Sequence, residues 1–454
     1  MNYDLGIIGA GPAGYVAAER AGRDGLKTVL FDKQYIGGVC LNEGCIPTKT
    51  LLHTAKLFEY AREAKKYGLQ MDGVSYDIPR LMKRKEKMVK KLVGGVQSQL
   101  KNSKVETVME EAAILEKSNG IITIKAKDQL FQCKNLLLAT GSETSFPPVP
   151  GLKKEKVYTN REILNLQSLP EQLTIIGGGV IGTEFADFFA TMGTKVTVIE
   201  MLDEIVPGMD RELAAMLRKM LVKKGVEFKL SSRVVEMNDQ AVIYEESGTQ
   251  HTIDQAMVLL SAGRKPVVDI PGIDKLGIEY DDHGIRIDRF CRTNIPNVYA
   301  GGDVTGFSLF AHTASREGEV AVNHILGKKD LMRYEAVPAV VYTNPEVSGV
   351  GLTEASAREK NIDYEVRALP LAYAGRYVIE HEGVNGYCKI LTGKPYGNIL
   401  GVHILGTPGS EIIFGGAMAI EEQLTIQEFQ EMIFPHPTVS EIVKETAFAQ
   451  PRQR

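Results

Sequence analysis

A glycine-rich turn occurs twice in this 454-residue sequence, each time in the same setting. A short apolar run leads into G-x-G-x-x-G, a helical segment follows, and a second apolar run ends in an acidic residue. In a β-α-β unit such glycines let the backbone approach a pyrophosphate, and the acid binds a ribose hydroxyl. The repeated positions are all displaced by 168 residues: Gly9, Gly11, Gly14 and Asp32, then Gly177, Gly179, Gly182 and Glu200. The repeat predicts an α/β fold with two dinucleotide sites.

Each turn lies between predicted strands, and a return strand follows later in the chain. The first unit has predicted strands at 3–8, 27–31 and 136–138, with a helix that ends near residue 23. The second has predicted strands at 173–176, 196–199 and 258–260, with a helix that ends near residue 192. Alternating apolar and polar residues over 105–132 and 226–257 predict small antiparallel meanders.

The remaining segments predict the domain organisation. A proline-rich linker at 146–151 separates the two nucleotide units. Beyond about Tyr334 there is no third glycine turn, and strands at 339–342 and 388–391 with a helix near 409–422 predict an α+β domain. The predicted domains are 1–145 for the first nucleotide, 146–264 for the second, 265–333 as a segment that completes the first, and 334–454 as an interface domain.

The composition is that of a globular enzyme and argues against several partners. Lys and Arg number 53 against 57 Asp and Glu, which gives a net charge of −4 and disfavours nucleic acid or an acidic membrane surface. The six basic residues between Lys83 and Lys91 accompany an apolar stripe that includes Leu81 and Val96. We therefore expect them to form the solvated face of a helix.

No apolar run approaches the ~18 residues of a membrane helix, and Asp4 stands where a signal peptide carries positive charge. A cytoplasmic location is therefore expected.

Two of the five cysteines, Cys40 and Cys45, are close enough in sequence to form a disulfide. A helix is predicted to begin near Cys45, and its dipole favours a thiolate there. Zinc is the rival ligand, but it normally takes four ligands and no C-x-x-C or H-x-x-x-H motif is present. We therefore interpret the pair as redox-active, with no metal. The other three cysteines, Cys133, Cys291 and Cys388, are expected to be buried packing residues.

One of the eight histidines has a distinctive setting. His436 lies in Phe434-Pro435-His436-Pro437-Thr438, five residues before Glu441. A carboxylate there can orient one ring nitrogen while the other exchanges a proton with a thiol.

Long motifs in a fixed order carry a family resemblance over essentially the whole chain. The sequence resembles flavoprotein disulfide reductases of the pyridine nucleotide-disulfide oxidoreductase family, and within it the dihydrolipoyl dehydrogenases. The resemblance implies two Rossmann-like FAD/NAD(P)-binding domains with central parallel sheets and antiparallel meanders, plus a C-terminal α+β dimerisation domain. The motifs are the two turns, G-G-x-C-x-N-x-G-C-I-P-x-K at 37–49, and segments 263–266, 299–303, 311–312, 345–347 and 436–438.

The resemblance implies that the first turn binds FAD and the second binds NAD. Lys49 and Glu184 match an ion pair that lies beside the flavin in relatives. Ala112 stands where many relatives have glycine. The further cofactor contacts implied by the family are Lys33, Lys49, Ala112, Gly141, Ser142, Asp303 and Ala311 on the FAD side, and Glu184 and Gly263 beside the NAD turn.

Glu200 favours NAD over NADP. It ends the strand at which the adenosine ribose is expected, and its carboxylate would accept hydrogen bonds from both hydroxyls but repel a 2′-phosphate. Residues 201–204 supply no arginine to bind that phosphate.

The resemblance also implies a homodimer with shared active sites. The dyad of His436 and Glu441 would reach the disulfide of the other subunit. A dihydrolipoyl thiol, deprotonated by that histidine, would attack Cys40, and Cys45 would be left as the thiolate beside the flavin. The lipoyl group is expected on another protein, from a 2-oxoacid dehydrogenase, glycine cleavage or acetoin system.

Other functions remain open alternatives. A mercuric reductase would carry a C-terminal cysteine pair, yet no cysteine follows Cys388. A glutathione reductase would prefer NADPH, which Glu200 opposes. A flavin redox sensor without turnover is disfavoured because the cysteines and the dyad occur together. Relatives often carry His-Ala where this chain has Phe434-Pro435, which bears on substrate choice.

Overall fold

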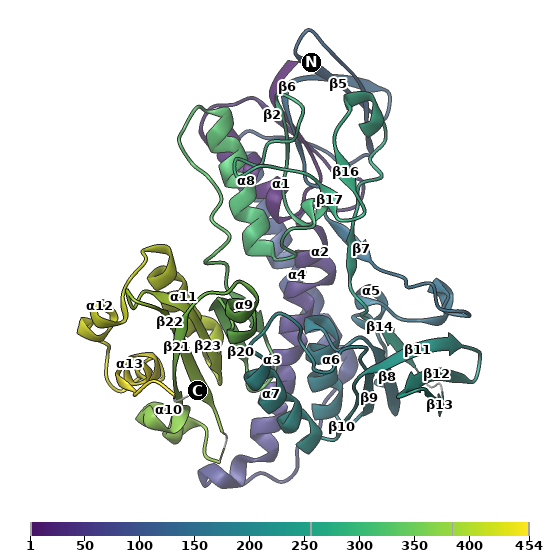
Figure 1. Ribbon diagram of the computed structural model, residues 1–454. Helices are drawn as coiled ribbons and strands as arrows, with labels where there is room; N and C mark the ends of the chain where they lie inside the picture. The colour runs from purple at the N-terminus through teal and green to yellow at the C-terminus, as the bar shows by residue number, and fades with distance from the viewer. Residues whose placement is uncertain (1, 255–256, 384, 453–454) are drawn as a thin grey trace.

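The computed structural model describes residues 2–254, 257–383 and 385–452 and contains three groups of sheets with helices around them (Figure 1). The predicted meander 226–257 and the predicted domains 1–145, 146–264 and 334–454 each include a few residues outside these ranges. Among the described residues, no helix is long and apolar enough to cross a membrane. The predicted α/β class is confirmed.

The first group holds the N-terminal turn. Its elements are β1 (Asn2–Ile8), α1 (Pro12–Arg23), β2 (Thr28–Phe31), α2 (Gly38–Glu43), α3 (Cys45–Arg62), α4 (Ile78–Asn102), β3 (Glu106–Val108), β4 (Ala112–Ser118), β5 (Ile121–Ala126), β6 (Gln129–Leu138) and β7 (Ser142–Thr144). The sheet order is β3-β2-β1-β6-β5-β4. The strands β3, β2, β1 and β6 are parallel, whereas β6, β5 and β4 form the antiparallel meander.

The second group repeats this plan. Its elements are α5 (Asn160–Ile163), β8 (Gln172–Ile176), α6 (Val180–Thr191), β9 (Lys195–Ile199), α7 (Arg211–Lys223), β10 (Val226–Lys229), β11 (Ser232–Met237), β12 (Ala241–Glu246), β13 (Thr249–Asp254), β14 (Val258–Leu260) and β15 (Arg264–Pro266). The parallel sheet runs β10-β9-β8-β14, and β11-β12-β13 form a separate antiparallel sheet. Strand β15 pairs with β7, so two short strands join the halves.

A third segment returns to the first group. Its elements are β16 (Tyr280–Asp281), β17 (Gly284–Ile285), β18 (Val298–Ala300) and α8 (Ala311–Ile325). Strand β18 pairs with β6 in parallel, and α8 packs along α1 (Figure 1). The helices can approach closely because Gly318 has no side chain. A Cβ there would lie 2.4 Å from the Ala13 carbonyl oxygen.

The C-terminal segment forms the five-stranded antiparallel sheet β19-β20-β23-β22-β21. Its elements are β19 (Ala339–Val341), β20 (Val347–Gly351), α9 (Glu354–Glu359), β21 (Tyr364–Pro370), α10 (Gly375–Glu380), β22 (Tyr387–Gly393), β23 (Ile399–Leu405), α11 (Gly409–Glu421), α12 (Ile426–Glu431) and α13 (Glu441–Phe448). Short 3₁₀ turns elsewhere cover Ala64–Tyr67, Lys154–Lys156, Ile273–Leu276, Asp303–Thr305 and Leu371–Tyr373. The mixture of a sheet and helices confirms the predicted α+β character.

Two expectations for local structure were wrong in part. The regions predicted as meanders each begin with a parallel strand, because β3 and β10 return to the sheet edge beside β2 and β9. The basic helix α4 does not expose every lysine. Lys85 is buried. Its Nζ is satisfied there, since it donates to the Leu164 carbonyl oxygen at 2.7 Å and to Asn165 Oδ1 at 2.9 Å.

Candidate active site

The first glycine turn leaves no room for side chains at two positions. Gly9 has φ +106°, and a Cβ there would lie 2.2 Å from the Ala139 carbonyl oxygen. A Cβ on Gly14 would lie 1.8 Å from the Gly9 carbonyl oxygen. Asp32 closes the turn, since its Oδ2 accepts from the Ala10 amide at 2.7 Å. The turn therefore requires glycine at both positions, and no side chain covers its backbone there.

The second turn has the same construction. Gly177 has φ +104°, and its Cβ would lie 2.5 Å from the Ser261 carbonyl oxygen. A Cβ on Gly182 would lie 2.0 Å from the Gly177 carbonyl oxygen. The buried Glu200 accepts from the Gly178 amide at 2.6 Å through Oε2. Each acid thus binds the residue that follows the first glycine of its own turn.

Both turns open into one continuous cleft of about 1760 Å³. That volume exceeds the ~300–1,000 Å³ usual for one small ligand, so the cleft has room for two dinucleotides. The expected site residues that line it are Gly9, Gly11, Asp32, Lys33, Cys40, Cys45, Lys49, Gly141, Ser142, Gly177, Gly179, Glu184, Glu200, Gly263, Asp303 and Ala311. Because a Cβ on Gly11 or Gly179 would meet no protein atom closer than 4.0 Å, the third position of each turn leaves space for a ligand.

The remaining expected residues lie outside the cleft lining. Gly14 and Gly182 instead support the turns from behind, through the close approaches given above. Ala112 begins β4, and its side chain is buried in the sheet. His436 and Glu441 are also absent from the described lining.

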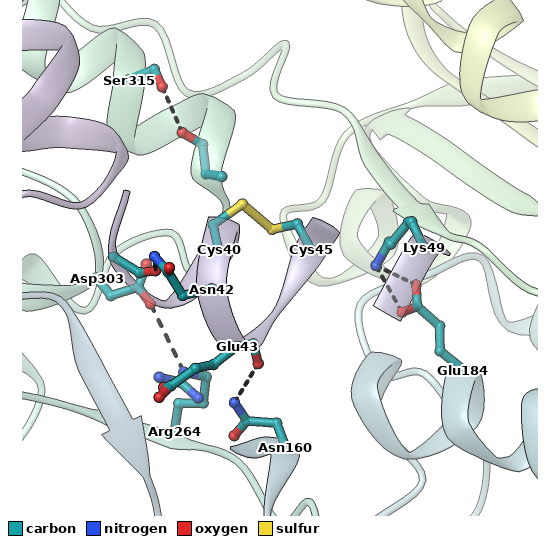
Figure 2. Close-up of a disulfide and its surroundings, with 12 residues drawn as sticks. Cys40, Asn42, Glu43, Cys45, Lys49, Asn160, Glu184, Arg264, Asp303 and Ser315 are labelled. Atoms are coloured by element: carbon teal, nitrogen blue, oxygen red, sulfur yellow. Dashed lines mark hydrogen bonds and ion pairs between the residues drawn. A yellow bond between two sulfur atoms is a disulfide. The ribbon is translucent and has the colours of Figure 1, made fainter. Parts of the chain in front are cut away.

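Cys40 and Cys45 form a disulfide within the cleft (Figure 2). Their Cα atoms are 4.7 Å apart, with Cys40 in α2 and Cys45 at the first position of α3. The helix N-terminus at Cys45 favours the thiolate that reduction would create.

The other three cysteines are free and buried, as predicted. Burial raises the pKa of the Cys133 thiol and of the Cys388 thiol to about 12, so neither is a reactive thiolate. Within the described part of the chain, no group of three or more His, Cys, Asp or Glu side chains is arranged to hold a metal ion.

Lys49 and Glu184 form the ion pair that the motifs suggested. Lys49 Nζ lies 2.9 and 2.7 Å from the two carboxylate oxygens of Glu184 (Figure 2). Glu184 is buried in α6 and also accepts from the Tyr342 amide at 3.0 Å. Lys49 Nζ lies 4.7 Å from the centre of the Tyr342 ring. Sequence reasoning missed Tyr342, because only folding brings this residue of the C-terminal segment to α3 and α6.

Asp303 reaches the lining of the cleft from the return segment. Its Oδ2 accepts from Ser142 Oγ at 2.5 Å and lies 4.0 Å from Arg264 Nε. Burial raises the pKa of Asp303, and the Ser142 hydrogen bond opposes that rise.

The buried carboxyl of Glu317, in α8, lies next to the segment that contains Asp303 and was also missed by sequence reasoning. Glu317 Oε2 accepts from the Gly302 amide at 2.6 Å, and Oε1 accepts from the Tyr334 hydroxyl at 2.9 Å. Burial raises the pKa of Glu317 to about 7. Its position on the buried face of α8 is the one signal that could have found it.

Lys33 is the most exposed of the expected FAD-side residues. Its Nζ lies 2.9 Å from Glu111 Oε1, and both side chains are more than half exposed. Lys33 therefore remains free to turn toward a bound phosphate.

His436 and Glu441 form the expected dyad on the C-terminal domain. His436 Nδ1 lies 2.8 Å from Glu441 Oε1, and the Thr438 amide donates to Glu441 Oε2 at 2.8 Å. The hydrogen bonds from Thr438 and His436 lower the pKa of Glu441. The His436 side chain is 78% exposed. Nε2 is thus the nitrogen that remains for a partner molecule.

Comparisons with known proteins agree with this architecture. Residues 3–318 match the model of the pyridine nucleotide-disulphide oxidoreductases, and residues 337–447 match the dimerisation domain of the same group. The chain belongs to the pyridine nucleotide-disulphide oxidoreductase family. It is an oxidoreductase with a redox disulfide, and the C-terminal match supports a homodimer.

Individual relatives show which members of this family the chain is similar to. A dihydrolipoyl dehydrogenase of Mycoplasma pneumoniae is 38% identical over 98% of this chain and 97% of its own length. One of Bacillus subtilis is 37% identical over 98% of this chain and 95% of its own. Similar crystal structures include LpdA from Mycobacterium tuberculosis, with TM-score 0.90, 25% identity and 98% coverage of both chains. The HOCl-induced flavoprotein disulfide reductase RclA from Escherichia coli has TM-score 0.85 and 27% identity, covering 99% of this chain and all of its own.

The cofactors of this family, FAD and NAD, fit the residues present. The glycines at the third position of each turn, Gly11 and Gly179, leave space for a ligand, and an acidic residue follows the second strand of each unit. The prediction of these two cofactors is confirmed.

Proposed function

We propose that this protein oxidises protein-bound dihydrolipoyl groups to lipoyl groups and reduces NAD, which is the activity of a dihydrolipoyl dehydrogenase. The observation that carries the proposal is the Cys40–Cys45 disulfide in a cleft that both glycine turns share. Relatives with this name at 35–38% identity over nearly the whole chain support it.

The proposed chemistry begins with two substrate thiols. His436 of the partner subunit takes a proton from one thiol through Nε2, while Glu441 holds Nδ1 and stabilises the charged ring. The substrate thiolate attacks Cys40 Sγ, the bond to Cys45 breaks, and Cys45 leaves as a thiolate at the N-terminus of α3. The second substrate thiol then attacks the mixed disulfide, which releases cyclic lipoyl and leaves Cys40 reduced.

The dithiol must then lose an electron pair. FAD and NAD, when bound, supply the route by which this pair leaves the protein as hydride. Lys49 is held by Glu184 at the wall of the cleft, where its charge stabilises electron density that arrives from Cys45.

We also propose which residues hold the two cofactors and where the domains begin and end. FAD would be held along the first turn by Asp32, Lys33, Gly141, Ser142, Asp303 and Ala311, and NAD would be held along the second by Glu184, Glu200 and Gly263. Ala112 contributes through its backbone. We propose the division into 1–145 with 265–333, 146–264 and 334–454, and the parallel pairing of β18 with β6 supports the return of 265–333 to the first unit.

We also propose a homodimer that meets a lipoyl-bearing protein in the cytoplasm. The exposed dyad of His436 and Glu441 lies outside its own cleft lining, which supports a role at the disulfide of a second copy.

Steady-state assays test the substrate assignment. We expect turnover with dihydrolipoamide and NAD, and with lipoamide and NADH, and rates lower by at least about tenfold with NADP or NADPH. Oxidised glutathione should give no turnover above background. Faster reduction of glutathione than of lipoamide would overturn the proposal.

A further inference from the structure

The two redox cysteines lie on different helices with a break between them. Helix α2 ends at Glu43 and α3 begins at Cys45, while Gly44 between them has φ −141° and ψ −106°, outside the helical region. While the sulfurs are bonded, the disulfide itself joins the helices. Once it is reduced, other contacts must keep the thiols within reach of each other.

Asn160 makes such a contact at the end of α2, next to the break. Its Nδ2 donates to the Glu43 carbonyl oxygen at 2.7 Å, and Figure 2 shows this bond below the disulfide. The accepting carbonyl belongs to the last residue of α2, where a helix leaves its carbonyl oxygens without intrahelical partners. Asn160 is only 8% exposed, so water does not readily replace it.

Asn160 is itself held rigidly. It is the first residue of α5, whose N-cap Thr159 forms a capping box with Glu162. The Thr144 hydroxyl lies 3.3 Å from Asn160 Oδ1 and donates to it, which leaves Nδ2 directed at Glu43. The support therefore comes from β7 and from the segment after the 146–151 linker.

A neighbouring ion pair acts on the same residue. Arg161 Nε lies 2.6 Å from Glu43 Oε2, with side chains 41% and 21% exposed. Partly exposed pairs of this kind contribute little, whereas a buried hydrogen bond contributes more. Asn160 is therefore the stronger of the two contacts.

We propose that Asn160 is a positioning residue, assisted by Arg161, that holds the break between α2 and α3 and so keeps the two reduced thiols close enough to re-form the disulfide. The inference rests on the proposed redox role of Cys40 and Cys45. Preorganised thiols lose less freedom when they join, so the contact favours the disulfide over the dithiol.

The equilibrium can be measured without turnover. Holoenzyme is equilibrated without oxygen in mixtures of reduced and oxidised dithiothreitol, quenched in acid, alkylated and weighed by mass spectrometry. Reduction of the disulfide takes two electrons and two protons from dithiothreitol, which closes its own disulfide. Wild type and variants are compared by the ratio of dithiol to disulfide at each mixture.

Removing the donor should move this ratio toward the dithiol. We expect Asn160→Ala and Asn160→Asp to raise it by roughly three- to tenfold, because each loses one buried hydrogen bond. The aspartate variant keeps the shape and the acceptor for Thr144 but turns a carboxylate oxygen toward the Glu43 carbonyl oxygen, so its ratio should rise at least as far as that of Asn160→Ala. Arg161→Gln should raise the ratio by less than about threefold.

Asn135→Ala is the matched control, since Asn135 Nδ2 also donates to a backbone carbonyl, that of Asp4, away from the disulfide. Its ratio should equal that of wild type. Unchanged ratios in both Asn160 variants, or an equal change in Asn135→Ala, would overturn the inference. Failure of the lipoamide assay in the wild type would instead refute the substrate assignment and leave this equilibrium measurable.

Discussion

The two glycine turns share their backbone geometry but differ in what covers them. Gly11 has φ −73° and ψ −174°, and Gly179 has φ −68° and ψ −172°. Over the first turn lies the start of α2, so closely that a Cβ on Gly38 would be 2.6 Å from Gly11 Cα. A Cβ on Gly179 would meet nothing within 4 Å. The start of α2 therefore covers part of the first turn, although Gly11 and Gly179 both leave space for a ligand.

The helices behind the turns differ in the same way. Helix α1 buries small residues, Ala13, Ala17 and Ala21, which lets α8 pack closely. Helix α6 buries Phe185, Phe188 and Phe189 in a core shared with α3 and α4. The first turn therefore lies against small side chains and the second against aromatic ones. Under the proposed assignment, FAD would bind at the first turn and NAD at the second.

Among changes at the two turns, the largest predicted effect comes from the glycine behind each turn. Gly14→Ala places a Cβ against the Gly9 carbonyl oxygen, and Gly182→Ala does the same at Gly177. We expect Gly14→Ala to lose bound flavin, and with it at least about a hundredfold of activity. Gly182→Ala should keep its flavin and raise the KM for NAD by roughly tenfold or more. Flavin absorbance per protein and steady-state kinetics measure both effects. Equal flavin loss in the two variants would remove the distinction between the sites.

The next effect concerns Glu317, the buried carboxyl of α8 that accepts from the Gly302 amide. Burial raises its pKa from 4.5 to about 7 in the folded protein. Its stabilising contribution is therefore complete below pH 4.5 and is lost as the pH rises through 7. Between pH 5 and 8 this should lower the free energy of unfolding by about 2 kcal/mol. In Glu317→Gln that part of the pH dependence should vanish. Urea unfolding of the wild type and of Glu317→Gln at pH 5 and at pH 8 measures this change. The same change in the free energy of unfolding in both proteins would contradict the prediction.

Glu200 gives a smaller effect, confined to the second turn. In Glu200→Ala the preference for NADH over NADPH should fall by about tenfold, because a 2′-phosphate no longer meets a carboxylate. The flavin content should stay that of the wild type. The ratio of kcat/KM for the two nucleotides measures the change, and an unaltered preference would show that another residue sets it.

The smallest effects on folding are expected at the third position of each turn. Gly11→Ala and Gly179→Ala place a Cβ in open space at ordinary φ values, so the free energy of unfolding should change by less than about 1 kcal/mol. Nucleotide binding should still weaken in both variants, since the methyl group occupies the ligand space. A large loss of stability in either would mean that protein, rather than ligand, fills that space.

The sequence predicted the local parts of this comparison better than the long-range parts. The turns, their strands and the acids at 32 and 200 follow from residue spacing, because one β-α-β unit determines them. The Tyr342 amide on Glu184 and the Gly302 amide on Glu317 join segments far apart in the chain, and no local pattern marks them. Lys85 was misassigned for the same reason, since its partners Leu164 and Asn165 lie in another segment.

The most direct test of the account asks whether the disulfide between the two sites carries the electrons. Cys45→Ser should retain bound FAD, because the first turn is untouched, and should lose at least about a thousandfold of dihydrolipoamide-dependent NAD reduction. The measurement is NADH formation per flavin in the wild type and the variant under the same conditions. Loss of activity with flavin retained is the predicted result. Full activity in Cys45→Ser would contradict the account.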